Sequence, residues 1–266
     1  MSFARVDTLA SLRHELERLE TGGGERLLAR AALGAAGADA ALKGGLALGS
    51  LHEVFASAGS QGAAATGFVL GLARRVTEGK RFVLWIRQDF SARESGELSM
   101  TGFSELGLDP CRVVVVRAPT AESVLRTAAD GLACNALGAV VAEIWGETRA
   151  FDLVASRKLT LAAGESGVTA LMLRLGAAPQ ASTAETRWIV RAAHSPPVAS
   201  WQAWGWPSFD AELARNRHGP TGRWIMEWTS DEYLFHERTA HPQRLAAAPA
   251  DRPLSPPAAA GQRRSA

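Results

Sequence analysis

Two hydrophobic patterns follow one another repeatedly along the middle of the chain: short apolar runs and longer segments with helical spacing. Short apolar runs bounded by turn residues cover residues 51–55, 81–87, 112–118, 138–144 and 168–175. Runs of this kind are typical of parallel strands that are buried on both faces of a sheet. The segments between them, about 62–77, 93–107, 120–136 and 150–164, have helical spacing. The pattern therefore predicts an α/β fold with a mostly parallel sheet between two layers of helices.

The N-terminal flank of this region is predicted to be helical. Leu9, Leu12, Leu16 and Leu19 recur at spacings of three and four, which predicts an amphipathic helix over residues 7–20. Three glycines follow, and a second helical piece is expected over about 25–42. We assign residues 1–43 to an N-terminal helical segment and residues 44–194 to the α/β core, which includes an added strand at 186–193.

The composition changes on the C-terminal side of the core. Residues 195–238 are rich in tryptophan, with β-like alternation near the end, and are predicted to form an irregular extension packed on the core. Residues 239–266 are rich in proline and alanine. Such a segment cannot bury enough apolar surface to offset its ordering entropy, so we expect a disordered tail.

Composition and charge narrow the class of protein. The net charge of +2 is nearly balanced, which permits contact with nucleic acid without arguing for it. Cys111 and Cys134 lie in apolar segments without metal-ligand spacing, so we expect core residues in a reducing compartment. The N-terminus is too charged for a signal peptide, and no run approaches the roughly 20 apolar residues of a membrane span. We therefore expect a cytoplasmic protein without metal or membrane contact.

A glycine-dotted turn between the first strand and the first helix is the strongest candidate for a ligand site. The stretch "FASAGSQGAAATGF" stands where a phosphate-binding loop would, but no lysine follows its glycines. Gly59, Gln61, Gly62 and Thr66 are the residues that would form a degenerate nucleotide site. Glu143 ends a buried strand, where an acid would hold magnesium or simply be solvated. Gln88 follows the predicted strand 81–87 and is the last residue that we assign to the degenerate nucleotide site.

The segment from Gly44 to Val76 resembles the first strand, phosphate loop and helix of the RecA fold. The resemblance implies a RecA-like three-layer core in which the chemical groups have been replaced. Gln61 and Gly62 fall on the glycine and lysine of the RecA loop, and Ala63 and Ala64 on its two hydroxyl residues. Glu143 falls on the magnesium-binding aspartate, and Gln88 lies close to the catalytic glutamate.

Within that superfamily the chain is similar to the ImuA family of damage-inducible mutagenesis proteins. The stretches "FDLVASRKLTLAAGESGVTALMLR", "ETRWIVRAA" and "GPTGRWIMEW" carry the resemblance, which covers roughly residues 7–230. It implies a role beside the polymerase-like protein ImuB and a damage-inducible replicative-type polymerase in error-prone synthesis past lesions. No cofactor is expected; ATP with magnesium is conceivable but not expected.

Further residues suggest contacts with other molecules, each with a structural alternative. Arg174 and Arg187 flank the loop 176–185, where RecA-type folds contact DNA, although surface arginines are common. The cluster formed by Trp201, Trp204, Trp206, Trp224 and Trp228 could bind a protein partner, stack bases or form the core of the extension. The helix at 7–20 could mediate self-association with a neighbouring subunit or pack on its own domain.

The favoured hypothesis is a non-catalytic RecA-like accessory protein of translesion DNA synthesis. Two alternatives remain. One is a DNA-stimulated ATPase with a degenerate phosphate loop. The other is a SulA-like inhibitor of cell division, because the ImuA family also resembles SulA.

Overall fold

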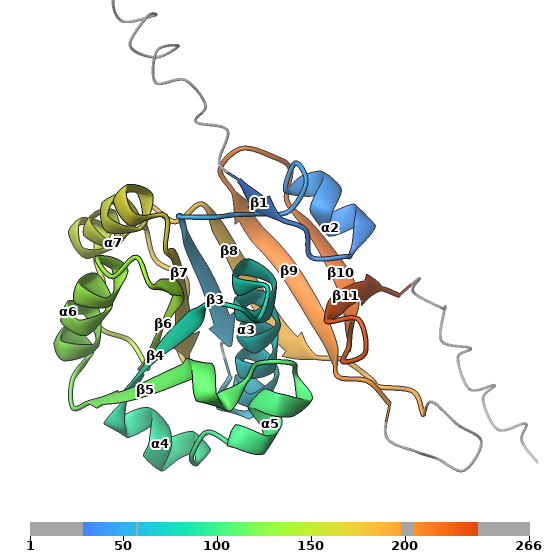
Figure 1. Ribbon diagram of the computed structural model, residues 1–266, viewed down its shortest axis with the longest axis horizontal. Helices are drawn as coiled ribbons and strands as arrows, with labels where there is room; N and C mark the ends of the chain where they lie inside the picture. Colours follow the sequence, from blue (N-terminus) through green and yellow to red (C-terminus); the bar gives the residue numbers. More distant parts are fainter. Residues whose placement is uncertain (1–28, 57, 198–204, 239–266) are drawn as a thin grey trace, which may run out of the picture.

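A continuous twisted sheet organises the molecule. The computed structural model describes residues 29–56, 58–197 and 205–238. Within them a nine-stranded sheet has the order β11-β10-β9-β8-β3-β7-β6-β4-β5, with helices on both faces (Figure 1). From β8 to β5 neighbouring strands are parallel, whereas β9, β10 and β11 join in antiparallel order. The predicted α/β fold with a mostly parallel sheet is confirmed.

The regular elements follow one another in short steps. The strands are β1 Arg30–Ala31, β2 Leu46–Ala47, β3 Leu51–Ala56, β4 Phe82–Gln88, β5 Val113–Ala118, β6 Leu137–Trp145, β7 Thr169–Leu175, β8 Thr186–Ala192, β9 Ser208–Asn216, β10 Gly222–Thr229 and β11 Leu234–Glu237. The helices are α2 Ala36–Ala41, α3 Gly62–Thr77, α4 Asp89–Ser95, α5 Met100–Glu105, α6 Ala121–Leu132 and α7 Leu153–Ser166, with the 3-10 turns η1 Gly59–Gln61 and η2 Pro110–Arg112.

Two apolar cores lie on the two faces of the sheet. Alternate residues of β3 point to opposite faces, so that Val54 packs towards α3 and Leu51 packs towards α7. The helix α3 is buried against the first face, together with α5. The helices α6 and α7 cover the other face, side by side (Figure 1). Covering both faces is what allows the parallel strands to be almost entirely apolar.

The N-terminal flank is less helical than predicted. Over the expected helix at 25–42, the described residues hold the short strand β1, which pairs with β2, and a helix confined to Ala36–Ala41. Gly34 has φ of 102°, outside the helical region. The carboxylate of Asp39 accepts hydrogen bonds from the backbone N–H groups of Leu33 and Gly34 at 2.7 and 2.8 Å. These side-chain contacts replace a helical turn.

Two further expectations are corrected. The helix expected over 93–107 is two helices, α4 and α5, because Gly96 adopts φ of 77° and ends α4. Cys111 and Cys134 are exposed rather than in the core, since both lie in turns just before a strand. The apolar composition around each cysteine belongs to the strand that follows it.

The C-terminal region is regular rather than irregular. Its strands β9, β10 and β11 extend the same sheet as three antiparallel neighbours beyond β8. Alternation explains this: Met226 and Trp228 are fully buried, while their neighbours Ile225, Glu227 and Thr229 are partly exposed. The Trp-rich aromatic cluster is present. Trp228 packs on Phe235, and Phe235 and Phe209 in turn pack on Phe68 of α3.

Several expectations fall on residues outside this description. The amphipathic segment 7–20, the tail 239–266, and both Trp201 and Trp204 lie outside the described residues. In the ranges that are described, no helix has the length and apolar character needed to cross a membrane.

A buried histidine links two strands of the nine-stranded sheet to the short strand β2. His52 of β3 has no exposed surface; its Nδ1 lies 2.8 Å from Thr186 Oγ1 of β8 and its Nε2 lies 2.8 Å from the carbonyl oxygen of Ala47 of β2. A carbonyl can only accept, so Nε2 carries the proton and Nδ1 accepts from the threonine hydroxyl. Burial is the main cause that lowers the pKa of His52 from 6.5 to about 4.

We predict that this histidine makes the protein acid-sensitive. Because the folded pKa lies below the unfolded one, the neutral ring stabilises the fold fully above pH 6.5, and this contribution is lost as the pH falls towards 4. The difference amounts to roughly 3 kcal/mol in the free energy of unfolding. Urea unfolding of the parent and of His52→Gln at a series of pH values measures it. Parallel curves for the two proteins between pH 7 and pH 4 would contradict the prediction.

Candidate functional site

The predicted loop lies at the carboxyl edge of the parallel strands, where α/β proteins bind ligands. After β3 the chain makes the single turn η1 and enters α3 at Gly62. Gln61 precedes the helix, and its Oε1 accepts a hydrogen bond of 2.7 Å from the backbone N–H of Ala192 at the end of β8. The loop side chain is therefore turned towards the sheet. The positions matched to the lysine and the hydroxyls of RecA, Gly62 to Ala64, bring no charged or hydroxyl group.

An indole lies against this loop. The ring of Trp145, the last residue of β6, lies beside Gly59, where a methyl group would be in ordinary contact with it at 3.4 Å, and beside Gly176. The carboxamide oxygen of Gln88 accepts from the backbone N–H of Trp145 at 3.1 Å. Gln88 thus holds the end of the neighbouring strand. Sequence reasoning missed Trp145, although a large aromatic residue at a strand end beside the loop was the available signal.

The acid of the candidate site is part of a buried ion pair. Glu143 is 1% exposed and Arg87, on the adjacent strand β4, is 4% exposed. Arg87 Nε donates to Glu143 Oε1 at 2.9 Å, and Trp85 Nε1 donates to Glu143 Oε2 at 2.9 Å. Both carboxylate oxygens therefore accept from the protein itself. The solvated carboxylate considered from the sequence is not what the structure contains.

Arg87 also fixes the segment that follows its strand. Its Nη1 donates to the carbonyl oxygen of Gly96 at 2.6 Å, and its Nη2 donates to Ser95 Oγ at 2.8 Å. These bonds tie the end of α4 to the sheet. The sequence signal for this role was an arginine inside the apolar run "FVLWIRQ", which the strand pattern alone did not distinguish from a polar strand end.

A cleft of about 520 Å³ opens between the start of α3 and the α4–α5 segment. Of the predicted nucleotide-site residues, Gly59, Gly62 and Thr66 line it, whereas Gln61, Gln88 and Glu143 do not. Glu94 and Glu97 line the same cleft and bring negative charge. Arg87 also lines this cleft, and Glu97 is paired with Arg117 at 2.9 Å, so both signs of charge are present there.

The two arginines proposed for DNA contact point into the protein. Arg174 has no exposed surface; its guanidinium lies over the rings of Phe151 and Phe55 at 5.5 and 5.9 Å, and burial lowers its pKa. Arg187 Nε donates to Glu53 Oε2 at 2.7 Å in a pair of 13% and 1% exposed side chains. In this arrangement neither guanidinium is presented to a DNA backbone.

The tryptophans divide into buried and partly exposed members. Trp228 is fully buried, and its ring packs edge-on against Phe235 at 4.8 Å, so it belongs to the fold and is not available to a partner. Trp224 is half-buried and packs on Trp188 at 6.1 Å. Trp206 is half-buried before β9. Among the described candidates, Trp206 and Trp224 thus keep part of their surface exposed.

We predict that Glu143 acts on stability through Arg87. Glu143→Ala removes the carboxylate that balances the buried Arg87 charge and leaves Arg87 Nε and the Trp85 N–H without an acceptor. This should lower the free energy of unfolding by about 3–5 kcal/mol. The double variant Arg87→Met with Glu143→Leu removes both charges and should recover most of that loss. Urea unfolding measures both effects. Glu165→Ala, on the exposed side of α7, is the control and should change stability by less than about 0.5 kcal/mol. A similarly small effect of Glu143→Ala would refute the role of the pair.

Comparison with known proteins identifies relatives. No family model matches the chain. Proteins named "Protein ImuA" from two strains of Caulobacter vibrioides are each 34% identical to it over 198 residues, a stretch that covers 69% of this chain and 77% of theirs. Identity of this level over most of both chains indicates common descent, and the chain belongs to the ImuA family.

Proposed function

We propose that the protein is a non-catalytic, RecA-like accessory factor of error-prone DNA synthesis past lesions in the DNA-damage response. It acts by binding ImuB and a damage-inducible polymerase. The observation that carries the proposal is the internal use of the candidate nucleotide site. Glu143 is paired with Arg87, and Gln61 is bonded to the end of β8. An enzyme that transfers phosphoryl groups needs those positions free to hold a metal and a phosphate.

The same edge supports the RecA-like interpretation of the fold. The loop after β3 and the acid on β6 stand on strands separated by β7, and both lie at the carboxyl ends of parallel strands. We propose that residues 44–194 are the RecA-like core. The segments 1–43 and 195–238 are additions to it, although β9 to β11 share its sheet. In this reading the core is retained as a scaffold and the additions provide contacts.

We predict that the protein does not hydrolyse ATP. No lysine follows the glycines of the loop, alanines stand at its two hydroxyl positions, and Glu143 is paired with Arg87. The charge that develops during phosphoryl transfer therefore lacks the groups that normally stabilise it. Turnover with magnesium, with and without single-stranded DNA, should equal that of a sample without protein. Glu143→Gln is the matched variant, because it keeps the shape of the buried side chain. A rate above background that falls in Glu143→Gln would establish the alternative, a DNA-stimulated ATPase.

We predict that ImuB binding depends on the tryptophans before β9. Exposed aromatic anchors dominate interfaces, and truncating one costs about 2 kcal/mol or more of binding. Trp201→Ala, Trp204→Ala or Trp206→Ala should therefore weaken ImuB capture by about tenfold or more while the melting temperature changes little. Trp228→Ala is the contrast: its loss of about 3–5 kcal/mol should appear in the unfolding free energy.

ImuB capture and the melting temperature, measured on the same variants, show whether a tryptophan contacts the partner or packs within the fold. If capture follows the melting temperature in every variant, and a chain without residues 1–21 still binds, the partner contacts the α/β core instead. If the division tubulin is captured from damaged cells and ImuB is not, the SulA-like function replaces the proposal.

A further inference from the structure

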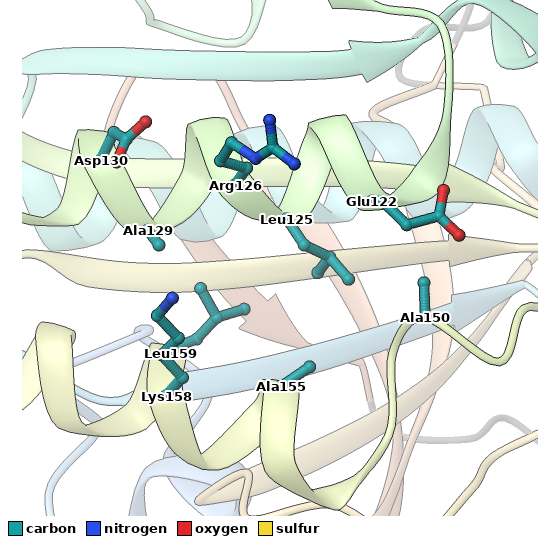
Figure 2. A pocket seen from close by; sticks show the side chains of 9 residues that line it. All are labelled: Glu122, Leu125, Arg126, Ala129, Asp130, Ala150, Ala155, Lys158 and Leu159. Carbon is teal, nitrogen blue, oxygen red and sulfur yellow. The ribbon is translucent and has the colours of Figure 1, made fainter.

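An apolar groove separates the two helices on the α6–α7 face. It has a volume of about 290 Å³ and lies on the opposite side of the sheet from α3. Figure 2 shows Leu125 and Ala129 of α6 facing Ala155 and Leu159 of α7 across it. Four charged residues stand around this apolar floor: Glu122, Arg126, Asp130 and Lys158. An apolar floor between charged rims is the form of surface that receives an amphipathic helix.

The outer surface of α7 continues the apolar character of the groove. Val154 is 75% exposed and Leu161 is 55% exposed. The two residues are seven positions apart and so lie on the same side of the helix, next to Lys158. Aliphatic side chains contiguous with a groove mark an interaction surface more strongly than isolated ones do.

The described chain begins close to this face. The carbonyl oxygen of Ala29 accepts a hydrogen bond of 2.8 Å from the backbone N–H of Leu48. The next residue, Gly49, lies against the end of α7: a methyl group at Gly49 would come within 3.1 Å of Gly167 and 3.2 Å of Ala163. Ala29, where the described chain begins, thus lies near the C-terminal end of α7.

We propose that residues 7–20 bind as a helix in the α6–α7 groove of their own chain. Leu9, Leu12, Leu16 and Leu19 would supply one apolar stripe, which matches the floor of the groove. The segment also carries four acids and two arginines, Asp7, Glu15, Glu17 and Glu20 with Arg13 and Arg18. The rim likewise carries both signs of charge, so acids of the segment can pair with Arg126 and Lys158 and its arginines with Glu122 and Asp130.

The connection is long enough for this contact. Eight residues, 21–28, separate the segment from Ala29, and they span at most about 28 Å when extended. The 14 residues of α7 are about 21 Å long, so the spacer reaches along the groove. A short tether gives an effective concentration on the order of millimolar, which favours binding within one chain over binding to a second copy at ordinary concentrations.

Ala155→Glu in the full-length protein tests the proposal. Ala155 is the third residue of α7, and its backbone N–H is capped by Asp152, so a glutamate there suits the helix start while it places a charge in the groove. Leu153→Glu is the matched control. It adds the same charge to the same turn, about 200° around the helix from Ala155. Ala129→Glu, on the other wall, is the second groove variant.

Trypsin cleavage after Arg13 and Arg18, followed by mass spectrometry, reads out the contact. The parent and Leu153→Glu should be cleaved slowly there, and both groove variants about tenfold faster or more, the effect of losing one well-buried leucine contact. Cleavage after Arg244 serves as the reference and should be equal in all four proteins. Unchanged melting temperatures show that the groove variants remain folded.

A second measurement separates one chain from two. Protection that is independent of protein concentration, in a monomer by light scattering, supports binding within the chain. A synthetic peptide of residues 5–22 should then bind a chain without residues 1–21 and not the full-length chain. Rapid cleavage of the parent, equal cleavage of the groove variants and the parent, or protection that appears only as a dimer forms would each overturn the proposal. None of these outcomes depends on ATP or ImuB, so the proposed function is tested separately.

Discussion

The buried ion pair between Arg87 and Glu143 determines the form of the edge where a ligand would bind. The two residues face each other in register on the neighbouring strands β4 and β6, and together they are almost completely shielded from water. A buried charge is tolerated when it is paired and hydrogen-bonded. Arg87 meets that requirement with Glu143 and then reaches Ser95 and Gly96. The hydrogen bonds of this guanidinium fix the end of α4, and α4 contributes to one wall of the cleft.

The opposite half of the molecule depends on packing rather than charge. Phe68 of α3 contacts Trp188, Phe209 and Phe235, which come from β8, β9 and β11. Aromatic contacts of this kind bring large buried area and a preferred geometry. Gly71 of α3 allows the approach, because a methyl group there would lie 2.4 Å from the Phe235 ring. The C-terminal strands are therefore part of the same core as the helix that begins at the loop.

Much of this architecture follows from local sequence pattern, and the site does not. The start of α3 at Gly62 and the strands β3 to β8 are predictable, because apolar runs and glycine turns act over a few residues. The pairing of Arg87 with Glu143, 56 positions apart, depends on strand order, which periodicity does not contain. For the same reason β9 to β11 were expected as an irregular extension. Their register with β8 is a long-range property, although the alternation of Trp224, Met226 and Trp228 was visible.

Three charged groups on the parallel strands of the sheet make contacts within the protein. Glu143 is held by Arg87, Glu53 is held by Arg187, and Arg174 rests on aromatic rings. Glu143 could bind a ligand in another protein of this architecture, but here both of its carboxylate oxygens accept from Trp85 and Arg87. Preorganised charge can stabilise a transition state only when it is aimed at the substrate. The proposed scaffold role rests on this internal use of Glu143, and it directs attention to the outer surfaces, where apolar side chains on α7 remain exposed.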